Sequence, residues 1–184
     1  MAFLLKDTKR PAGSSGRQAT IDQWIQVTQA LPTGAGVVLP ATTTGQLFRV
    51  RGGAVLVRAI VGRVITVHSG TATNLKVSSK QLDNGSVAVG TAVDVASNVA
   101  VASLEVGSFL FTEGDGTAMV TSNAGAAFIG TNSGMWVAPQ GEIYLTTSAT
   151  NTGADRWDIY YQPLDAGSFV EPAILTNGLL TAAI

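Results

Sequence analysis

The stretch 47–67, LFRVRGGAVLVRAIVGRVITV, decides the fold of this chain. From Phe48 to Arg51 apolar and charged side chains alternate, which is the period-two pattern of a half-buried strand. The pair Gly52-Gly53 then interrupts the pattern, and glycine tolerates the positive φ values of tight turns. Residues 54–67 continue as a nearly unbroken run rich in valine and isoleucine, which favour strands. The stretch therefore predicts two long strands separated by a turn.

Short apolar runs separated by turn residues continue along the chain to residue 162. Turns such as Asp83-Asn84-Gly85 and Pro139-Gln140-Gly141 recur at a spacing of about ten residues, which indicates a sandwich or jelly roll rather than alternating strands and helices. We predict an all-β chain with a single β-sandwich, jelly-roll-like domain over 46–172 and an extended N-terminal arm. Beyond the opening stretch, strands are expected over 74–82, 86–95, 99–106, 108–112, 117–121, 126–130, 135–138, 141–148 and 155–162.

Thr, Ser, Asn and Gly fill most polar positions of the chain, and charge is scarce. Only 12% of the 184 residues are charged, the formal net charge is −1, and Cys is absent. The lack of Cys excludes disulfides and thiolate metal sites, and the small net charge gives no general attraction to nucleic acid or anionic membranes. We expect no signal peptide and no transmembrane span. This composition favours a structural or binding protein whose surface is covered by neighbouring subunits.

Residues 1–20 form a basic arm that contains Pro, Gly and Ser, a composition typical of flexible, extended segments. The arm is either a disordered terminus or a tether that becomes ordered against a partner subunit. Under the second interpretation its interface residues are Phe3, Leu4, Leu5, Lys9 and Arg10.

Residues 21–45 form a transition segment in which two patterns compete. Thr20 and Gln23 have the spacing of a capping box, and the apolar residues that follow share one helical face. Ile25, Val27 and Gln29 also alternate as a strand would. We expect a short helix here and keep a strand as the alternative.

Residues 173–184 form an apolar C-terminal tail with almost no charge. Exposed apolar surface of this kind tends to become buried. The tail either packs back on its own domain or docks on another subunit, with Leu179 and Leu180 as interface residues.

Four arginines form the one charge cluster of note, because no acidic residue occurs between positions 23 and 82. On two strands joined at Gly52-Gly53 they would make a basic stripe, and arginine suits bidentate pairing with carboxylates across an interface. A solvated sheet face is the alternative, and nucleic acid is disfavoured because no aromatic residues interleave the stripe. The four are Arg49, Arg51, Arg58 and Arg63, of which we take the first three as interface residues.

Catalytic, cofactor and metal sites are not expected. His68 is the single histidine and reads as an ordinary residue beside a turn, since no nucleophile motif accompanies it. Glu113 and Asp115 lie in a Gly-rich turn that is too sparse for a calcium loop. Glycoside hydrolysis would need two of the acids to act as a pair, and we do not expect such a pair. Besides Glu113 and Asp115, the acids considered for it are Glu105, Glu142, Asp155 and Asp158.

The alternation of residues in the segment 155–162 predicts which side chains face the core and which face the surface. Alternation places Trp157, Ile159 and Tyr161 in the core. It places Arg156, Asp158 and Tyr160 on the surface, with Arg156 and Asp158 as an ion pair.

The stretches 137–143, 146–153 and 156–165, together with 47–67, resemble small all-β virion proteins of tailed bacteriophages. These are accessory head proteins of the capsid decoration or cement class. The resemblance implies a jelly-roll-like homotrimer that binds the major capsid protein on the capsid surface, is assembled in the host cytoplasm and has no enzymatic activity.

Two other function classes share this composition. One is a phage tail or fibre-base component. The other is a carbohydrate-binding β-sandwich used in host attachment, which would need exposed aromatic side chains and for which Trp136, Tyr144 and Tyr160 are the plausible set.

Overall fold

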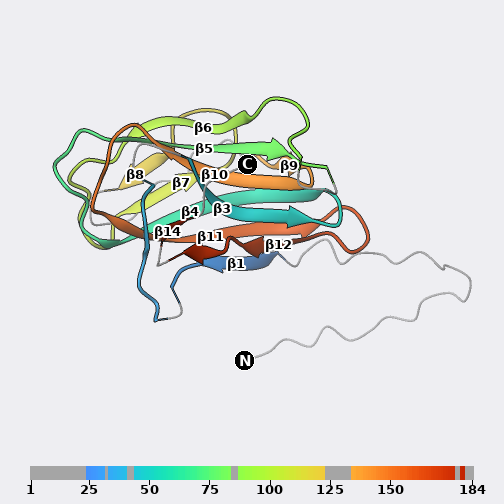
Figure 1. Cartoon of the computed structure of the whole chain (residues 1–184), viewed down its shortest axis with the longest axis horizontal. Coiled ribbons are helices and arrows are strands. Elements are labelled where there is room, and N and C mark those ends of the chain that lie inside the picture. Colours follow the sequence, from blue (N-terminus) through green and yellow to red (C-terminus); the bar gives the residue numbers. More distant parts are fainter. Residues whose placement is uncertain are drawn as a thin grey trace, which may run out of the picture.

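Two β-sheets pack face to face in the computed structural model, which describes residues 24–31, 33–40, 44–83, 87–122, 134–176 and 179–180 (Figure 1). The predicted all-β sandwich is confirmed. Within the described residues the strands are β1 (Ile25–Gln29), β2 (Val37–Val38), β3 (Thr44–Arg51), β4 (Val55–Thr66), β5 (Asn74–Gln81), β6 (Val93–Ala100), β7 (Phe109–Thr112), β8 (Val120–Ser122), β9 (Trp136–Ala138), β10 (Gly141–Thr147), β11 (Ala154–Pro163), β12 (Phe169–Pro172), β13 (Leu175–Thr176) and β14 (Leu179–Leu180). The interface residues expected in the arm 1–20 and the strand expected over 126–130 lie outside this part of the chain.

The nine-stranded sheet is built around the long strands β4 and β11, and its order is β13-β14-β2-β11-β4-β7-β8. Strand β1 also pairs with β11, and β9 also pairs with β4. The five-stranded sheet has the order β12-β3-β10-β5-β6. All the pairings are antiparallel except that between β14 and β2.

The turn at Gly52-Gly53 carries the chain from one sheet to the other. Both glycines have positive φ, 71° and 132°, as the sequence predicts. Strand β3 belongs to the five-stranded sheet and β4 to the nine-stranded sheet, so the two strands do not pair. A Cβ on Gly53 would lie 2.6 Å from the Cβ of Asp165, so the close approach of the 164–168 loop also requires glycine here.

The core lies between the sheets and is filled mainly by valine, leucine and isoleucine. Trp157, Ile159 and Tyr161 project into it from β11, which confirms the predicted inner face of that segment. The Trp157 ring lies against Gly62, the residue opposite it on β4, where a Cβ would come within 2.7 Å of the ring. A glycine at this position therefore makes room for the largest side chain of the core.

The helix expected within 21–45 is wrong, because residues 25–29 form strand β1. The strand alternation of Ile25, Val27 and Gln29 prevails, since pairing with β11 satisfies the backbone of this segment. Asp158 fixes this pairing by accepting hydrogen bonds from Gln26 Nε2 at 2.9 Å and from Thr28. Together with β2, this segment is part of the nine-stranded sheet.

The boundaries of the expected strands over 86–95 and 99–106 are also wrong. A single strand, β6, spans 93–100 instead, and the residues after it turn through Ser103, which has a φ of 59°. The residues after β6 form a loop rather than a strand. They are apolar because two of them, Val101 and Leu104, are buried in the core.

The described part of the C-terminal tail packs on its own domain. Ala173 is buried, and Leu180 packs against the core, where its side chain lies over Gly45. Leu179 and Ile174 remain 49% and 78% exposed, so the tail is half covered. Among the described residues no helix is long and apolar enough to cross a membrane.

Candidate functional site

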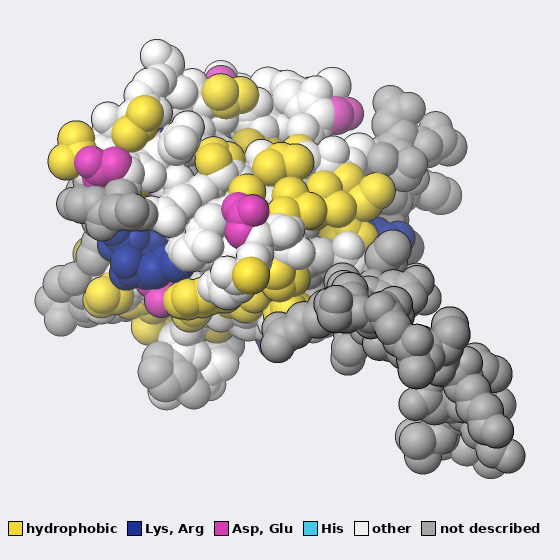
Figure 2. All heavy atoms as spheres, turned by 90° about the vertical axis from the view of Figure 1, so that its right-hand side faces the viewer, with side chains coloured by type: hydrophobic (Ala, Val, Ile, Leu, Met, Phe, Trp, Pro, Cys, Tyr) yellow, Lys and Arg dark blue, Asp and Glu magenta, His cyan; other side chains and the backbone are white. Residues whose placement is uncertain are grey.

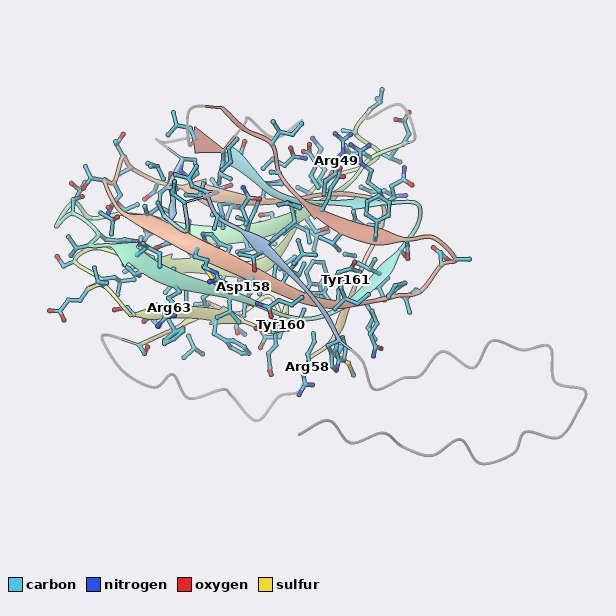
Figure 3. The ribbon with its side chains drawn as sticks, turned by 90° about the horizontal axis from the view of Figure 1, so that it is seen from below. Arg49, Arg58, Arg63, Asp158, Tyr160 and Tyr161 are labelled. Carbon is cyan, nitrogen blue, oxygen red and sulfur yellow. The ribbon has the colours of Figure 1, made fainter. Side chains whose placement is uncertain are left out.

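The outer face of the nine-stranded sheet carries two exposed arginines, each held over an aromatic ring. The Arg58 guanidinium lies 5.5 Å from the centroid of the Trp24 ring, and that of Arg63 lies 5.6 Å from the Phe109 ring. At these distances the negative face of the ring attracts the cation. Figure 3 shows both arginines on the same side of the sandwich. We call this set of four residues the arginine–aromatic face.

A groove of about 350 Å³ lies beside Arg58 on this face. Its lining is mostly apolar, and Glu113 adds a carboxylate to it. A smaller hollow of about 190 Å³ shares Trp24, Arg58 and Glu113 with it. The groove is lined by Trp24, Arg58, Ala59, Val61, Phe111, Glu113 and Tyr160. Mostly apolar walls with a few polar groups are typical of a recognition site.

The predicted ion pair on β11 is confirmed. Arg156 Nη2 lies 3.5 Å from Asp158 Oδ1 and also donates to the Thr28 hydroxyl at 3.4 Å. This polar cluster spans β1 and β11 and leaves Asp158 only 15% exposed. Its charges therefore hold the two strands together.

The outer face of the five-stranded sheet has a different arrangement, in which charges of opposite sign face each other across neighbouring strands. Arg49 on β3 stands opposite Glu171 on β12 and Glu142 on β10, and Glu142 stands opposite Lys80 on β5. Glu142 is 2% exposed and accepts a hydrogen bond of 2.9 Å from Gln46 Nε2. We call these residues the charge ladder. Such cross-strand pairs of opposite sign stabilise a sheet.

The single basic stripe predicted from the sequence is therefore wrong. Arg49 and Arg51 lie on the five-stranded sheet, whereas Arg58 and Arg63 lie on the other, and Figure 3 shows Arg49 on the opposite side from Arg58 and Arg63. Arg51 also forms an ion pair with Glu171. Acids that are distant in the sequence thus neutralise one half of the expected stripe.

His68 and Asp155 form a buried pair at the end of β4. His68 Nε2 lies 2.8 Å from Asp155 Oδ1, and His68 Nδ1 lies 2.9 Å from the Val101 carbonyl oxygen. Both side chains are fully buried. Gly153 lies so close that a Cβ there would come within 2.0 Å of the imidazole ring. His68 therefore lies beside the bend at residues 70–71, as the sequence suggested, and is part of the packed interior.

The geometry assigns one proton to the contact between His68 and Asp155. A carbonyl oxygen only accepts, so Nδ1 donates to Val101, and the contact from Nε2 to Oδ1 needs a single shared proton. Burial lowers the pKa of His68, but the hydrogen bond and negative charge of Asp155 outweigh it, so the pKa is raised above 6.5. Burial raises the pKa of Asp155, and His68 opposes that shift. Both ring nitrogens are engaged, which leaves neither to activate a nucleophile.

The neighbouring loop is tied to this pair by Asn151. Its side-chain oxygen accepts hydrogen bonds from the backbone amides of Ser69 at 2.9 Å and Gly153 at 3.0 Å. The backbone amide of His68 itself donates to the Leu104 carbonyl at 3.0 Å. Three loops therefore converge on His68, and the pair has a structural role.

A groove of about 430 Å³ with both apolar and polar walls opens between the edges of the two sheets, where β6 and β9 lie. Its polar side chains are Ser79, Gln81, Thr91 and Asp94. Three valines on its rim, Val89, Val93 and Val137, are 47%, 67% and 55% exposed. Trp136 and Pro139 complete its apolar wall. Figure 2 faces this end of the molecule and shows hydrophobic side chains gathered there among scattered charges. We call this surface the valine groove.

The aromatic set expected for sugar binding does not form one surface. Tyr144 is 9% exposed and lies on β10 of the five-stranded sheet, whereas Trp136 and Tyr160 lie on the other sheet. Instead, Tyr160 joins Trp24 in the groove beside Arg58. Sequence reasoning missed this grouping because Trp24, just before β1, and Phe109, on β7, are distant along the chain from the arginines that they contact.

The acids weighed for catalysis or metal binding are dispersed. Asp115 accepts hydrogen bonds from the amide and hydroxyl of Thr117 at 2.9 and 2.6 Å, which lower its pKa and confirm the turn role expected of it. Among the described residues no group of three or more His, Cys, Asp or Glu side chains is placed to hold a metal ion.

The chain was also compared with known proteins. No protein-family model, no curated protein and no solved structure matches it.

Proposed function

We propose that this protein is a non-enzymatic structural component of a tailed-phage particle. In this role it is a capsid decoration or cement protein that binds the major capsid protein at the surface of the assembled head and stabilises the shell. The observation that carries the proposal is the valine groove, whose rim carries three exposed valines. The resemblance of the stretches 47–67, 137–143, 146–153 and 156–165 to accessory head proteins is the basis for naming the major capsid protein as the partner.

The physical chemistry of the surface supports a binding role. Exposed apolar area contributes about 25 cal/mol per Å² when it leaves water, so the rim valines favour association with a second protein. Short Thr and Ser side chains lose little conformational entropy when a surface becomes an interface. A protein that binds only the assembled shell stabilises that state by mass action.

The buried histidine supports a role without catalysis. His68 is the single histidine of the chain, and both of its ring nitrogens hold interior partners. It has no nitrogen available as a general base for a bound substrate.

Quantifying this protein against the major shell subunit in purified particles tests the proposal. A copy number equal to that of the shell subunit, or a simple fraction of it, is the expected result for a decoration protein. A few copies per particle would place it at the tail or fibre base, and absence from the particle would contradict both roles. Sedimentation equilibrium tests the proposed homotrimer.

A pair of matched variants tests the valine groove. Val93→Asp places a charge on its rim and should weaken binding to stripped heads by about tenfold or more. Val106→Asp makes the same change at another exposed valine, outside the groove, and should bind as the unmodified protein does. Equal binding of the two variants would contradict the role of the groove.

A further inference from the structure

Arg58 and Arg63 differ from Arg51 and Arg156, which form ion pairs. Within the described part of the chain no carboxylate neutralises Arg58 or Arg63. Arg51 pairs with Glu171 and Arg156 with Asp158, and no such ion pair involves Arg58 or Arg63 there. Each side chain is nevertheless positioned by its aromatic ring. A guanidinium held in this way keeps N–H donors for a carboxylate and loses little freedom on binding.

The spacing of the two arginines fits an extended ligand. They are five positions apart on β4, which corresponds to roughly 16 Å along a strand. Val61 lies between them, and with Phe111 and Tyr160 it forms part of the apolar lining of the groove beside Arg58. The face therefore offers two cationic points with an apolar hollow near one of them.

We propose that the arginine–aromatic face docks an extended acidic segment of a partner protein. Two carboxylates of the segment pair with Arg58 and Arg63, and an apolar side chain between them enters the groove. The inference rests on the proposed function in one respect, since it takes the shell subunit as the source of that segment.

Acidic groups on the same face favour a peptide over nucleic acid. Asp158 stands opposite Val61 on β4 and is paired with Arg156, whereas the Glu113 carboxylate lines the groove beside Arg58. A nucleic-acid strand carries a phosphate at every nucleotide and would bring some of them close to Glu113. A peptide with two separated carboxylates avoids this repulsion.

A titration followed by NMR at the Trp24 indole N–H tests the docking surface. The probe is a synthetic peptide of about twelve residues with two glutamates five positions apart and leucine between them. Its matched control replaces both glutamates by glutamine, and a single-stranded oligothymidine serves as the nucleic-acid probe. The protein variants are Arg58→Glu and Arg63→Glu, with Arg51→Glu as the control that makes the same charge change on the other sheet.

The expected result is saturable binding of the acidic peptide that weakens by about tenfold or more in Arg58→Glu and in Arg63→Glu. Arg51→Glu should bind within about twofold of the unmodified protein, and the glutamine peptide should bind weakly. Absence of peptide binding, equal binding of the glutamine peptide, an equal loss in Arg51→Glu, or preferred binding of oligothymidine would each overturn the proposal.

Binding of the same variants to heads stripped of this protein separates this inference from the proposed function. If the unmodified protein and both variants bind heads equally, the shell subunit is not the source of the acidic segment, and the proposed function stands. If the unmodified protein does not bind heads, the proposed function is wrong, and the peptide titration still decides whether the face binds an acidic segment.

Discussion

The buried pair of His68 and Asp155 and the arginine–aromatic face both involve strands of the nine-stranded sheet, yet their charges have opposite roles. In the pair, both side chains are fully buried and the contact leaves no ring nitrogen of His68 without a partner. On the face, Arg58 and Arg63 are exposed and supported by rings alone in the described structure. Burial and partners, rather than residue type, therefore separate charges that hold a fold from charges available for binding.

The largest expected effect comes from removing one member of the buried pair. Asp155→Ala leaves His68 Nε2 without its partner in the interior and should lower the free energy of unfolding by about 3–5 kcal/mol. Urea denaturation measures this change. A loss below about 1 kcal/mol would mean that the pair is no more important than an exposed ion pair.

The second largest loss of stability is expected from a substitution that crowds the His68 ring. Gly153→Ala adds a Cβ that would lie 2.0 Å from the ring and should cost about 1–3 kcal/mol, because the imidazole must move. Gly70→Ala is the matched control, since the nearest atom to a Cβ there is Ser103 Oγ at 3.6 Å. Equal thermal stability of the two variants would show that the site tolerates displacement of the ring.

The free energy of unfolding should depend on pH through the titration of His68. Because the pKa of His68 is raised in the folded state, its stabilising contribution is complete below pH 6.5 and is lost as the pH rises through the raised value. The slope is at most about 1.4 kcal/mol per pH unit for one proton. Urea denaturation at several pH values measures it.

Asp155→Asn serves as the control for this series. Without the carboxylate, burial outweighs the remaining hydrogen bond to the Val101 carbonyl and lowers the pKa of His68, so the variant should instead lose stability as the pH falls below about 6.5. The same slope in both proteins would contradict the assignment of the shared proton.

The smallest expected effect on stability comes from the exposed face. Arg58→Gln and Arg63→Gln each remove an exposed cation–π contact and should cost less than about 1 kcal/mol. Thermal unfolding measures the change. A cost as large as that of Asp155→Ala would show that these arginines hold the fold, and the contrast between the two regions would fail.

Particular residues show where sequence reasoning succeeds in this protein. Trp157, Ile159 and Tyr161 alternate with Arg156, Asp158 and Tyr160, and the structure places the two sets on the two faces predicted for them. The turn at Gly52-Gly53 is also as predicted. These features are local, since they depend on the side-chain period of a strand and on the backbone freedom of glycine.

Other residues show where prediction from the sequence fails. The segment around Ile25 satisfies both a helical and a strand pattern, and pairing with β11, which lies far along the chain, decides for the strand. The arginine stripe fails for the same reason, because Glu142 and Glu171 reach Arg49 and Arg51 from other strands.

The order of residues along the chain was enough to predict the all-β class and the core face of β11. The pairing of distant strands places β3 and β4 in different sheets, brings His68 to Asp155, and puts Trp24 and Phe109 beside Arg58 and Arg63. Side-chain periodicity is encoded between neighbouring residues, whereas the partner of a charge is set by strand order, which brings together residues far apart in the chain.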